Sequence, residues 1–254
     1  MIAPALLAEW TKIRTVRSTI WTLLPTLVLC PVMAYVSGSS FKSVLADDPG
    51  TFDPLFATFY SLTLGQLGLA VFGVLAVGSE YSTGTVRSTF MAVPQRGRLY
   101  AAKVSAIALT MLAVAVPTVL ATFFAAQAGL GSHRVALGDP GVLGAVVGAV
   151  LYLTLICLLA TGITAVLRSS VAALVILLPV LFLGGSGLGT VPQIRDFARY
   201  LPDQAGMVAL HLTVPDDPQQ LDLAYGPWTG LGIMALWTLA ALAGGLFALR
   251  RRAV

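Results

Sequence analysis

The chain has 254 residues, of which 57% are hydrophobic and only 10% charged, and its formal net charge is +4. A typical soluble domain is about 45–50% apolar and about 25% charged. So few charges exclude a water-soluble globule of this size. Because the basic residues lie between long apolar runs, they indicate membrane topology and argue against a nucleic-acid partner.

The first segment, residues 3–17, is predicted to form an amphipathic helix in the membrane interface. Leu6, Trp10 and Ile13 fall along one helical face, and Lys12 lies on the opposite face. A basic residue at the end of the segment interrupts the apolar face, so a plain basic anchor is the alternative. The apolar run that follows is interpreted as a retained span, because no small-residue cleavage site with a soluble mature domain comes after it.

Six apolar runs are long enough for helices that cross a bilayer, which takes about 20 mainly apolar residues. Only helices and closed barrels satisfy their backbone in lipid, and continuous runs of this length favour helices. The predicted spans are 18–37, 55–79, 104–128, 142–167, 171–189 and 227–249. The fold class is therefore all-α integral membrane, with one transmembrane domain over residues 1–254.

The basic residues predict that both termini are cytoplasmic, because Lys and Arg concentrate in cytoplasmic loops. With the N-terminus inside, 11 of the 15 Lys and Arg lie on the inner side: Lys12, Arg14, Arg17, Arg87, Arg96, Arg98, Lys103, Arg168, Arg250, Arg251 and Arg252. The other four are Lys42, Arg134, Arg195 and Arg199. All nine aspartates fall outside, in the exterior segments.

The central portions of the predicted spans contain no Asp, Glu, Lys, Arg or His. Proton- and sodium-driven transporters commonly place such groups in the membrane, so self-powered secondary transport is disfavoured, although broken helices with backbone ligands would escape this argument. No G-x-x-x-x-G-K-[ST] phosphate loop is present, and no cytoplasmic stretch is long enough for a nucleotide-binding domain. Energy for any transport must then come from another chain.

Gln66 and Gln127 are the main strongly polar side chains at depth. Hydrogen bonding between helices is one interpretation. The other is that Gln66 lines a polar path together with Tyr60 and Thr63, which precede it in the second span. A close approach of two helices is expected at Gly144-x-x-x-Gly148.

Enzyme and metal classes find little support. The stretch 184–187, GGSG, resembles the G-x-S-G of rhomboid intramembrane proteases, which would make Ser186 a nucleophile. Those enzymes supply the base as a histidine on the sixth core span, and residues 227–249 contain none. Cys30 and Cys157 lie in apolar runs without a Cys-x-x-Cys or Cys/His cluster, so we expect them to serve packing.

Two segments between the spans have patterns of their own. The cytoplasmic loop 80–103 begins with EYSTGTVRSTF, in which Ser82 or Thr83 can cap a short helix and the apolar residues at 86 and 90 share one face. Such a helix would lie along the membrane and dock on a soluble partner. The alternative is a solvated basic loop. In the exterior segment 190–226, apolar spacing predicts short interfacial or re-entrant helices, the second over about 204–213.

The pattern Glu80-Tyr81-x-x-Gly84-Thr85-x-Arg87 after a second span resembles the cytoplasmic loop of type-2 ABC exporter permeases. Residues 8–14, AEWTKIR, resemble the N-terminal segment of the actinobacterial members. The layout is similar over the whole chain, including a short inner hairpin at 168–170 and paired short helices before the last span.

This resemblance implies the transmembrane permease subunit of an ATP-driven exporter in the plasma membrane, moving a hydrophobic or amphipathic drug, antibiotic, lipid or peptide. The implied partners are an ABC ATP-binding subunit, which holds ATP and Mg, and a second permease copy or paralogue. This chain itself would have no catalytic residue, cofactor or metal. The rival class is a non-transporting membrane partner of an ABC ATPase, such as an immunity or sensor subunit.

The resemblance also implies which residues meet the ATPase. They form the coupling helix and are Glu80, Tyr81, Gly84, Thr85, Arg87 and Phe90, with 168–171 as a minor second contact. In this view Glu80 anchors the helix at the bilayer edge or pairs with a base such as Arg87. Tyr81 packs at the interface, and Gly84 allows a tight approach.

Overall fold

A computed structural model describes residues 3–15, 17–47, 53–85, 96–183, 199–212 and 225–251 of the chain. Within these ranges every regular element is a helix. Five helical segments there are long and apolar enough to cross a membrane: Thr19–Lys42, Pro54–Thr83, Arg96–His133, Val142–Leu167 and Pro227–Arg251. The chain is therefore an all-α, multi-pass membrane protein, as its composition predicts.

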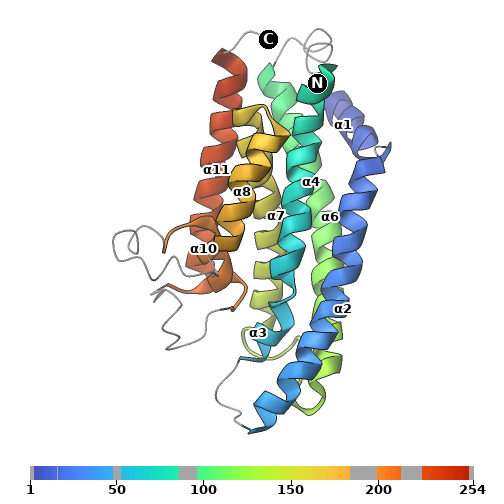
Figure 1. Ribbon diagram of the computed structural model, residues 1–254, viewed down its shortest axis with the longest axis vertical. Helices are drawn as coiled ribbons and strands as arrows, with labels where there is room; N and C mark the ends of the chain where they lie inside the picture. Colours follow the sequence, from blue (N-terminus) through green and yellow to red (C-terminus); the bar gives the residue numbers. More distant parts are fainter. Residues whose placement is uncertain are drawn as a thin grey trace.

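The long helices form an elongated bundle with shorter helices at its ends and side (Figure 1). In chain order the elements are α1 (Ala3–Thr15), α2 (Arg17–Asp47), α3 (Pro54–Phe59), α4 (Leu62–Thr83), α6 (Arg96–Leu130), η1 (Gly131–His133), α7 (Val142–Leu167), α8 (Ser170–Leu183), α10 (Pro202–Ala209) and α11 (Pro227–Arg251). Helix α1 and the last turn of α11 lie at one end, called the α1 end below, and α3 lies at the opposite, α3 end (Figure 1).

The first, second and fifth predicted spans differ from the helices that the structure describes. Helix α2 continues to Asp47, well past the predicted end at residue 37. The second predicted span, 55–79, consists of α3 and α4, which are separated at Tyr60 and Ser61. The fifth predicted span, 171–189, is described only as α8, which reaches Leu183. The remainder of that span, including Ser186, lies outside the described residues.

Both ends of the predicted coupling loop 80–103 belong to the helices that flank it. Helix α4 continues to Thr83 and α6 begins at Arg96. The extension of α4 is polar, and the hydroxyls of Ser82 and Thr83 donate to the carbonyl of Ser79 at 2.9 and 2.8 Å. Hydropathy identifies the stretch that lipid can cover, whereas the helix continues wherever its polar groups find partners.

Glycines set the closest contacts between the long helices, because small residues let two backbones approach. A Cβ on Gly162 of α7 would lie 2.7 Å from backbone atoms of α11, and one on Gly129 of α6 would lie 2.5 Å from a carbonyl of α2. At Gly144 and Gly148 the nearest atoms are at ordinary contact distances of 3.9 and 3.6 Å. The contact at Gly144-x-x-x-Gly148 is therefore looser than the contacts at Gly162 and Gly129.

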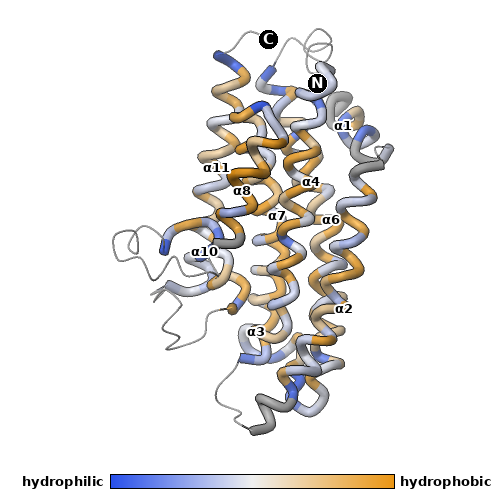
Figure 2. The backbone as a smooth tube through the Cα atoms, viewed as in Figure 1, coloured by the Kyte–Doolittle hydropathy of each residue, from blue (hydrophilic) through white to orange (hydrophobic). Residues whose placement is uncertain are grey.

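Hydrophobic residues run along most of the length of the long helices (Figure 2). In the most apolar stretches of α2 and α11, only 22% of the residues are buried. Trp21, Leu29, Leu236 and Leu239 are among the large exposed side chains. An apolar surface of this extent must be covered by lipid or by another membrane protein.

Basic side chains concentrate at the α1 end. In the part of the chain that the structure describes, this end carries Lys12, Arg96, Arg98, Lys103, Arg168, Arg250 and Arg251, whereas Lys42 and Arg134 lie near the α3 end. The charge asymmetry predicted between the two sides of the membrane is thus an asymmetry between the two ends of the bundle.

Candidate functional sites: a cavity and a buried ion cluster

A cavity of about 410 Å³ lies between α4, α7, α8 and α10, toward the α3 end (Figure 1). Tyr60, Thr63 and Gln66, which the sequence predicts as path-lining residues, all belong to its wall. Tyr60 lies at the break between α3 and α4, and Thr63 and Gln66 lie in the first turns of α4. The structure therefore brings the three predicted residues together at one cavity.

Most of the cavity wall is apolar. The rings of Phe56 and Tyr60 stack with their centroids 5.8 Å apart and an interplanar angle of 25°. Tyr60 stands at the rim, since 52% of it is exposed. Aliphatic and thioether side chains complete this surface: Leu64, Leu67, Leu181, Met207, Leu210 and Leu212. A mainly apolar wall with a few polar groups is typical of small-molecule sites.

Tyr152 joins three helices at the cavity. From α7, its hydroxyl donates a hydrogen bond to Oε1 of Gln66 on α4. Helix α10 rests on the hydroxyl end of the same ring, so closely that a Cβ on Gly206 would overlap it. Because only glycine permits this approach, Gly206 fixes the distance between α10 and the bundle.

Asp203 lines the same cavity, and one of its carboxylate oxygens has no partner. The residue follows Pro202 in the first turn of α10 and is 5% exposed. Its Oδ2 accepts a hydrogen bond from Nε2 of Gln204 at 3.2 Å, while its Oδ1 is buried and accepts none. Burial raises the pKa of this carboxyl above its usual range, although hydrogen bonds from Gln204 oppose the shift. Buried polar groups are normally satisfied, so Asp203 is a candidate functional residue.

The sequence did not single out Asp203. The segment 190–226 is predicted to lie outside the spans, where an aspartate needs no explanation. In the structure α10 packs against α7 and α11 and brings this carboxylate to the cavity. Gly206, and Gly230 of α11, whose Cβ would lie 2.7 Å from the carbonyl of Ala205, permit this packing. Isolated glycines in a sequence do not say which helices they bring together.

At the α1 end, four charged side chains form a cluster that joins α1, α4 and α6. Nζ of Lys103 donates to Oε2 of Glu9 at 2.6 Å and to Oε1 of Glu80 at 2.7 Å. Lys12 of α1 also pairs with Glu80. Glu9, Glu80 and Lys103 are buried, and Lys12 is partly exposed. Two carboxylates and two ammonium groups balance, which is what buried charges require.

Two arginines bind the last carbonyls of α11, which have no partner within the helix. Nη2 of Arg168 donates to the carbonyl of Ala248 at 2.7 Å, and Nη1 of Arg96 donates to that of Leu249 at 3.1 Å. Cations are favourable at this end of a helix dipole. The guanidinium carbon of Arg168 also lies 6.0 Å from the ring centroid of Tyr81. The turn between α7 and α8 is thereby connected to both α11 and α4.

Two of the predicted coupling residues belong to α4 itself. Glu80 pairs with Lys12 and Lys103, and Arg87, the partner named from the sequence, lies outside the described residues. Tyr81 is partly buried beside Arg168. These side chains fix the end of α4 within the bundle.

The other predicted coupling residues follow the helix end. Gly84 ends α4 in the left-handed region, with a φ of 70°, and nothing lies within 4 Å of where its Cβ would be. Thr85 is exposed, and its hydroxyl lies 3.0 Å from that of Thr83. Phe90, like Arg87, lies outside the described residues.

Gln127 has a structural role. Its Nε2 donates to the hydroxyl of Thr58 at 2.9 Å, and its Oε1 accepts from the backbone amide of Val135 at the same distance. Both polar ends of the side chain are therefore used to connect α6 to α3 and to the segment after η1, so the interpretation as a hydrogen-bonding residue is confirmed for Gln127.

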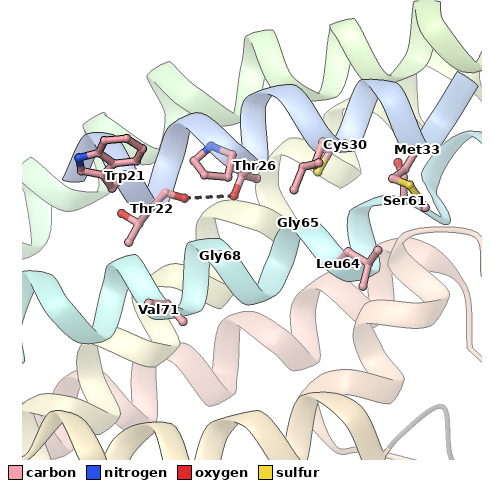
Figure 3. A pocket seen from close by; sticks show the side chains of 12 residues that line it. Trp21, Thr22, Thr26, Cys30, Met33, Ser61, Leu64, Gly65, Gly68 and Val71 are labelled. Atoms are coloured by element: carbon pink, nitrogen blue, oxygen red, sulfur yellow. Dashed lines mark hydrogen bonds between the residues drawn. The ribbon is translucent and has the colours of Figure 1, made fainter. Parts of the chain in front are cut away.

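A second hollow, of about 400 Å³, is a groove between α2 and α4 (Figure 3). Gly65 and Gly68 bring α4 close to Cys30 and Thr26 there, since a Cβ on either glycine would overlap its neighbour. The hydroxyl of Thr26 bonds to the carbonyl of Thr22 within α2. The described residues that line it include no Asp, Glu, Lys, Arg or His, so this groove has no charged group that could select a ligand by charge.

No group of three His, Cys, Asp or Glu residues that could hold a metal ion occurs in the described ranges. Cys30 and Cys157 are buried and free. His211, the only histidine between the fifth and sixth predicted spans, has its Nδ1 3.5 Å from Oδ2 of Asp53. No known family model matches the chain, and no curated protein matches it.

Proposed function

We propose that this chain is the transmembrane permease subunit of an ATP-driven exporter in the plasma membrane. Its α1 end, which carries most of the basic side chains, faces the cytoplasm. A separate ABC subunit binds ATP and Mg there. A second permease, identical or related, completes the transport path, and the substrate is a hydrophobic or amphipathic compound.

The observation that carries this proposal is the set of bonds at the α1 end around Glu80 and Tyr81. Glu80 pairs with side chains of α1 and α6, and Tyr81 lies beside Arg168, which binds α11. The segment after Gly84 is therefore attached to a connected group of helices. A push on that segment by a soluble partner is transmitted to the bundle as a whole.

Helix α4 also connects this end to the cavity. Glu80 and Gln66 lie on the same helix, about 21 Å apart at 1.5 Å per residue. A movement of the α1 end therefore reaches the residues that line the cavity without crossing a loop. This arrangement is what alternating access requires of a subunit that has no energy source of its own.

The proposal is tested by reconstitution. The full chain is co-expressed with a candidate ATP-binding cassette subunit from the same genome, purified, and placed in proteoliposomes that contain neutral, cationic and anionic hydrophobic dyes. ATP-dependent dye flux supports the proposal. Stable association without flux favours the non-transporting alternative. Pumping by the purified chain alone would overturn the proposal.

Gly84 supplies the sharpest variant. In Gly84→Trp the bulky ring projects from an open position, so we expect the bundle to fold and ATPase association to weaken roughly tenfold or more, equivalent to about 1.4 kcal/mol. Transport should fall accordingly. Gly84→Ala is the matched control, because it imposes the same left-handed strain of about 1–2 kcal/mol without bulk. Normal association and transport in Gly84→Trp would contradict docking at this segment.

A further inference from the structure

We propose that the cavity between α4, α7, α8 and α10 binds a lipophilic cation, with the carboxylate of Asp203 as its counter-charge. The proposal rests on the proposed function in one respect: the bound compound is the exported substrate. It goes further because it names the charge of that substrate.

Charge is the first argument. Among the described residues that line the cavity there is no Lys, Arg or His, and Asp203 is the only carboxylic acid. The side chain is 5% exposed, its Oδ2 accepts from Nε2 of Gln204 at 3.2 Å, the backbone amides of Asp203 and Gln204 are its other donors, and its Oδ1 has no hydrogen-bond partner among the described residues. A buried carboxylate in these surroundings is stabilised by a positive charge close by. An anionic ligand would meet repulsion without any compensating cation.

The aromatic wall is the second argument. The stacked rings of Phe56 and Tyr60 stand on one side of the cavity, and the ring of Tyr152 lines it as well. Aromatic faces attract cations electrostatically, most strongly when the cation has lost its water. The carboxylate and the aromatic rings therefore both favour a positively charged ligand.

The remaining wall decides what kind of cation fits. Leu64, Leu67, Met207 and Leu210 surround the polar groups with apolar surface. A hard metal ion such as calcium takes 6–8 oxygen ligands, far more than this wall offers. An organic cation with a large apolar body can pair its charge with the carboxylate and pack its body against the aliphatic side chains. A cavity of about 410 Å³ is within the size range of sites for such molecules.

The experiment compares two probes of the same shape and opposite charge, tetraphenylphosphonium and tetraphenylborate. The full-length chain is placed in nanodiscs of phosphatidylglycerol, which contains no amine, and empty nanodiscs give the background. We expect saturable binding of tetraphenylphosphonium and none of tetraphenylborate. Asp203→Asn should weaken tetraphenylphosphonium binding roughly tenfold or more, since it removes the charge at nearly constant shape.

Two further variants complete the design. Asp203→Glu keeps the negative charge and should retain the preference for the cation. Asp139→Asn is the matched control, because Asp139 is an exposed aspartate outside the cavity wall, and it should bind as the wild type does. The proposal is overturned by equal tetraphenylphosphonium affinity in Asp203→Asn and wild type, or by equal binding of the two probes.

The binding assay contains no ATPase, so it separates the inference from the proposed function. Charge-selective binding that depends on Asp203, in a chain that supports no ATP-dependent flux, leaves the inference standing and removes the exporter function. ATP-dependent flux of tetraphenylphosphonium that is unchanged in Asp203→Asn has the opposite meaning: the exporter stands and the inference fails.

Discussion

Glu80 and Asp203 are carboxylates buried to nearly the same extent, 6% and 5% exposed, in very different surroundings. Glu80, at the α1 end, is paired with two lysines. Asp203, at the cavity, has only neutral amide partners among the described residues, and its Oδ1 has none there. The two carboxylates are thus equally buried, but only Glu80 has cationic partners that balance its charge.

The difference separates two uses of a buried charge. A neutral, fully bonded cluster holds helices together, and its members depend on one another. An isolated carboxylate weakens the fold that contains it, and its retention points to a ligand that restores the balance. Within the function and the inference proposed above, the α1 end transmits movement, and the cavity selects what is bound.

The largest predicted effect is at the paired site. Lys103→Met removes the ammonium group that lies between Glu9 and Glu80 and leaves two buried carboxylates with only Lys12 near them. Breaking a buried ion pair on one side costs about 3–5 kcal/mol. We expect a loss of stability of that size, measured as thermal or denaturant unfolding of the purified full chain.

Lys42→Met is the matched control, because Lys42 is exposed near the α3 end, and it should change stability by less than about 0.5 kcal/mol. Adding Glu9→Gln to Lys103→Met should recover part of the loss, since one of the stranded charges is removed. A Lys103→Met protein as stable as the wild type would mean that the cluster does not bind α1 to the bundle.

At Asp203 the expected change in stability has the opposite sign. Asp203→Asn removes a buried charge and should stabilise the protein at pH 7.5 by about 1 kcal/mol, the low end of the cost of a buried group without a partner. The same variant is expected to lose cation binding. Unfolding temperature and probe affinity, measured on one preparation, should therefore change in opposite directions.

The stability difference at Asp203 should depend on pH. Burial raises the pKa of the folded carboxyl, so the stability of the wild type relative to Asp203→Asn is highest below the unfolded pKa, about 3.9, and falls as the pH rises through the raised value. Among the described residues, the titratable groups that interact with it are the phenols of Tyr152 and Tyr225, and phenols ordinarily titrate at higher pH. A constant difference from pH 4 to 8 would contradict the burial of a charge.

The sequence predicts the long helices because lipid demands continuous apolar runs, and the bounds of α7 coincide with the prediction for residues 142–167. It does not predict the separation of α3 from α4. There, Asp53 caps α3 through the amide of Leu55, and the chain turns at Tyr60 and Ser61 within a run that remains apolar. A hydropathy profile does not detect this break, because no polar segment separates the two helices.

The candidate sites differ in the same way. The sequence places Tyr60, Thr63 and Gln66 close together in the second predicted span, and they share a cavity. Lys103 and Glu9 lie 94 positions apart in the sequence, and their pairing depends on how α1 folds back onto α6. The role of Asp203 likewise depends on the packing of α10. Patterns within one element can be predicted, whereas contacts between distant elements need the structure.

Asp53 provides the intermediate case and the smallest predicted effect. It pairs with His211 at 3.5 Å, but its side chain is 49% exposed. Burial raises the pKa of Asp53, yet the hydrogen bond from His211, the amide of Leu55 and the charge of His211 together lower it below its usual value. Asp53→Asn keeps the helix cap and removes the charge, so we expect a loss below about 1 kcal/mol at pH 6.

Because the folded pKa of Asp53 is the lower one, its stabilising contribution is present above the unfolded pKa, about 3.9, and is lost as the pH falls through the folded value. The wild type and Asp53→Asn should therefore converge in unfolding temperature below about pH 4, opposite in sense to the behaviour at Asp203. Asp139→Asn serves again as the exposed control. An ion pair should contribute more to stability when it is buried, as at Glu80, than when it is half exposed, as at Asp53. An equal loss of stability in Asp53→Asn and Lys103→Met would contradict this expectation.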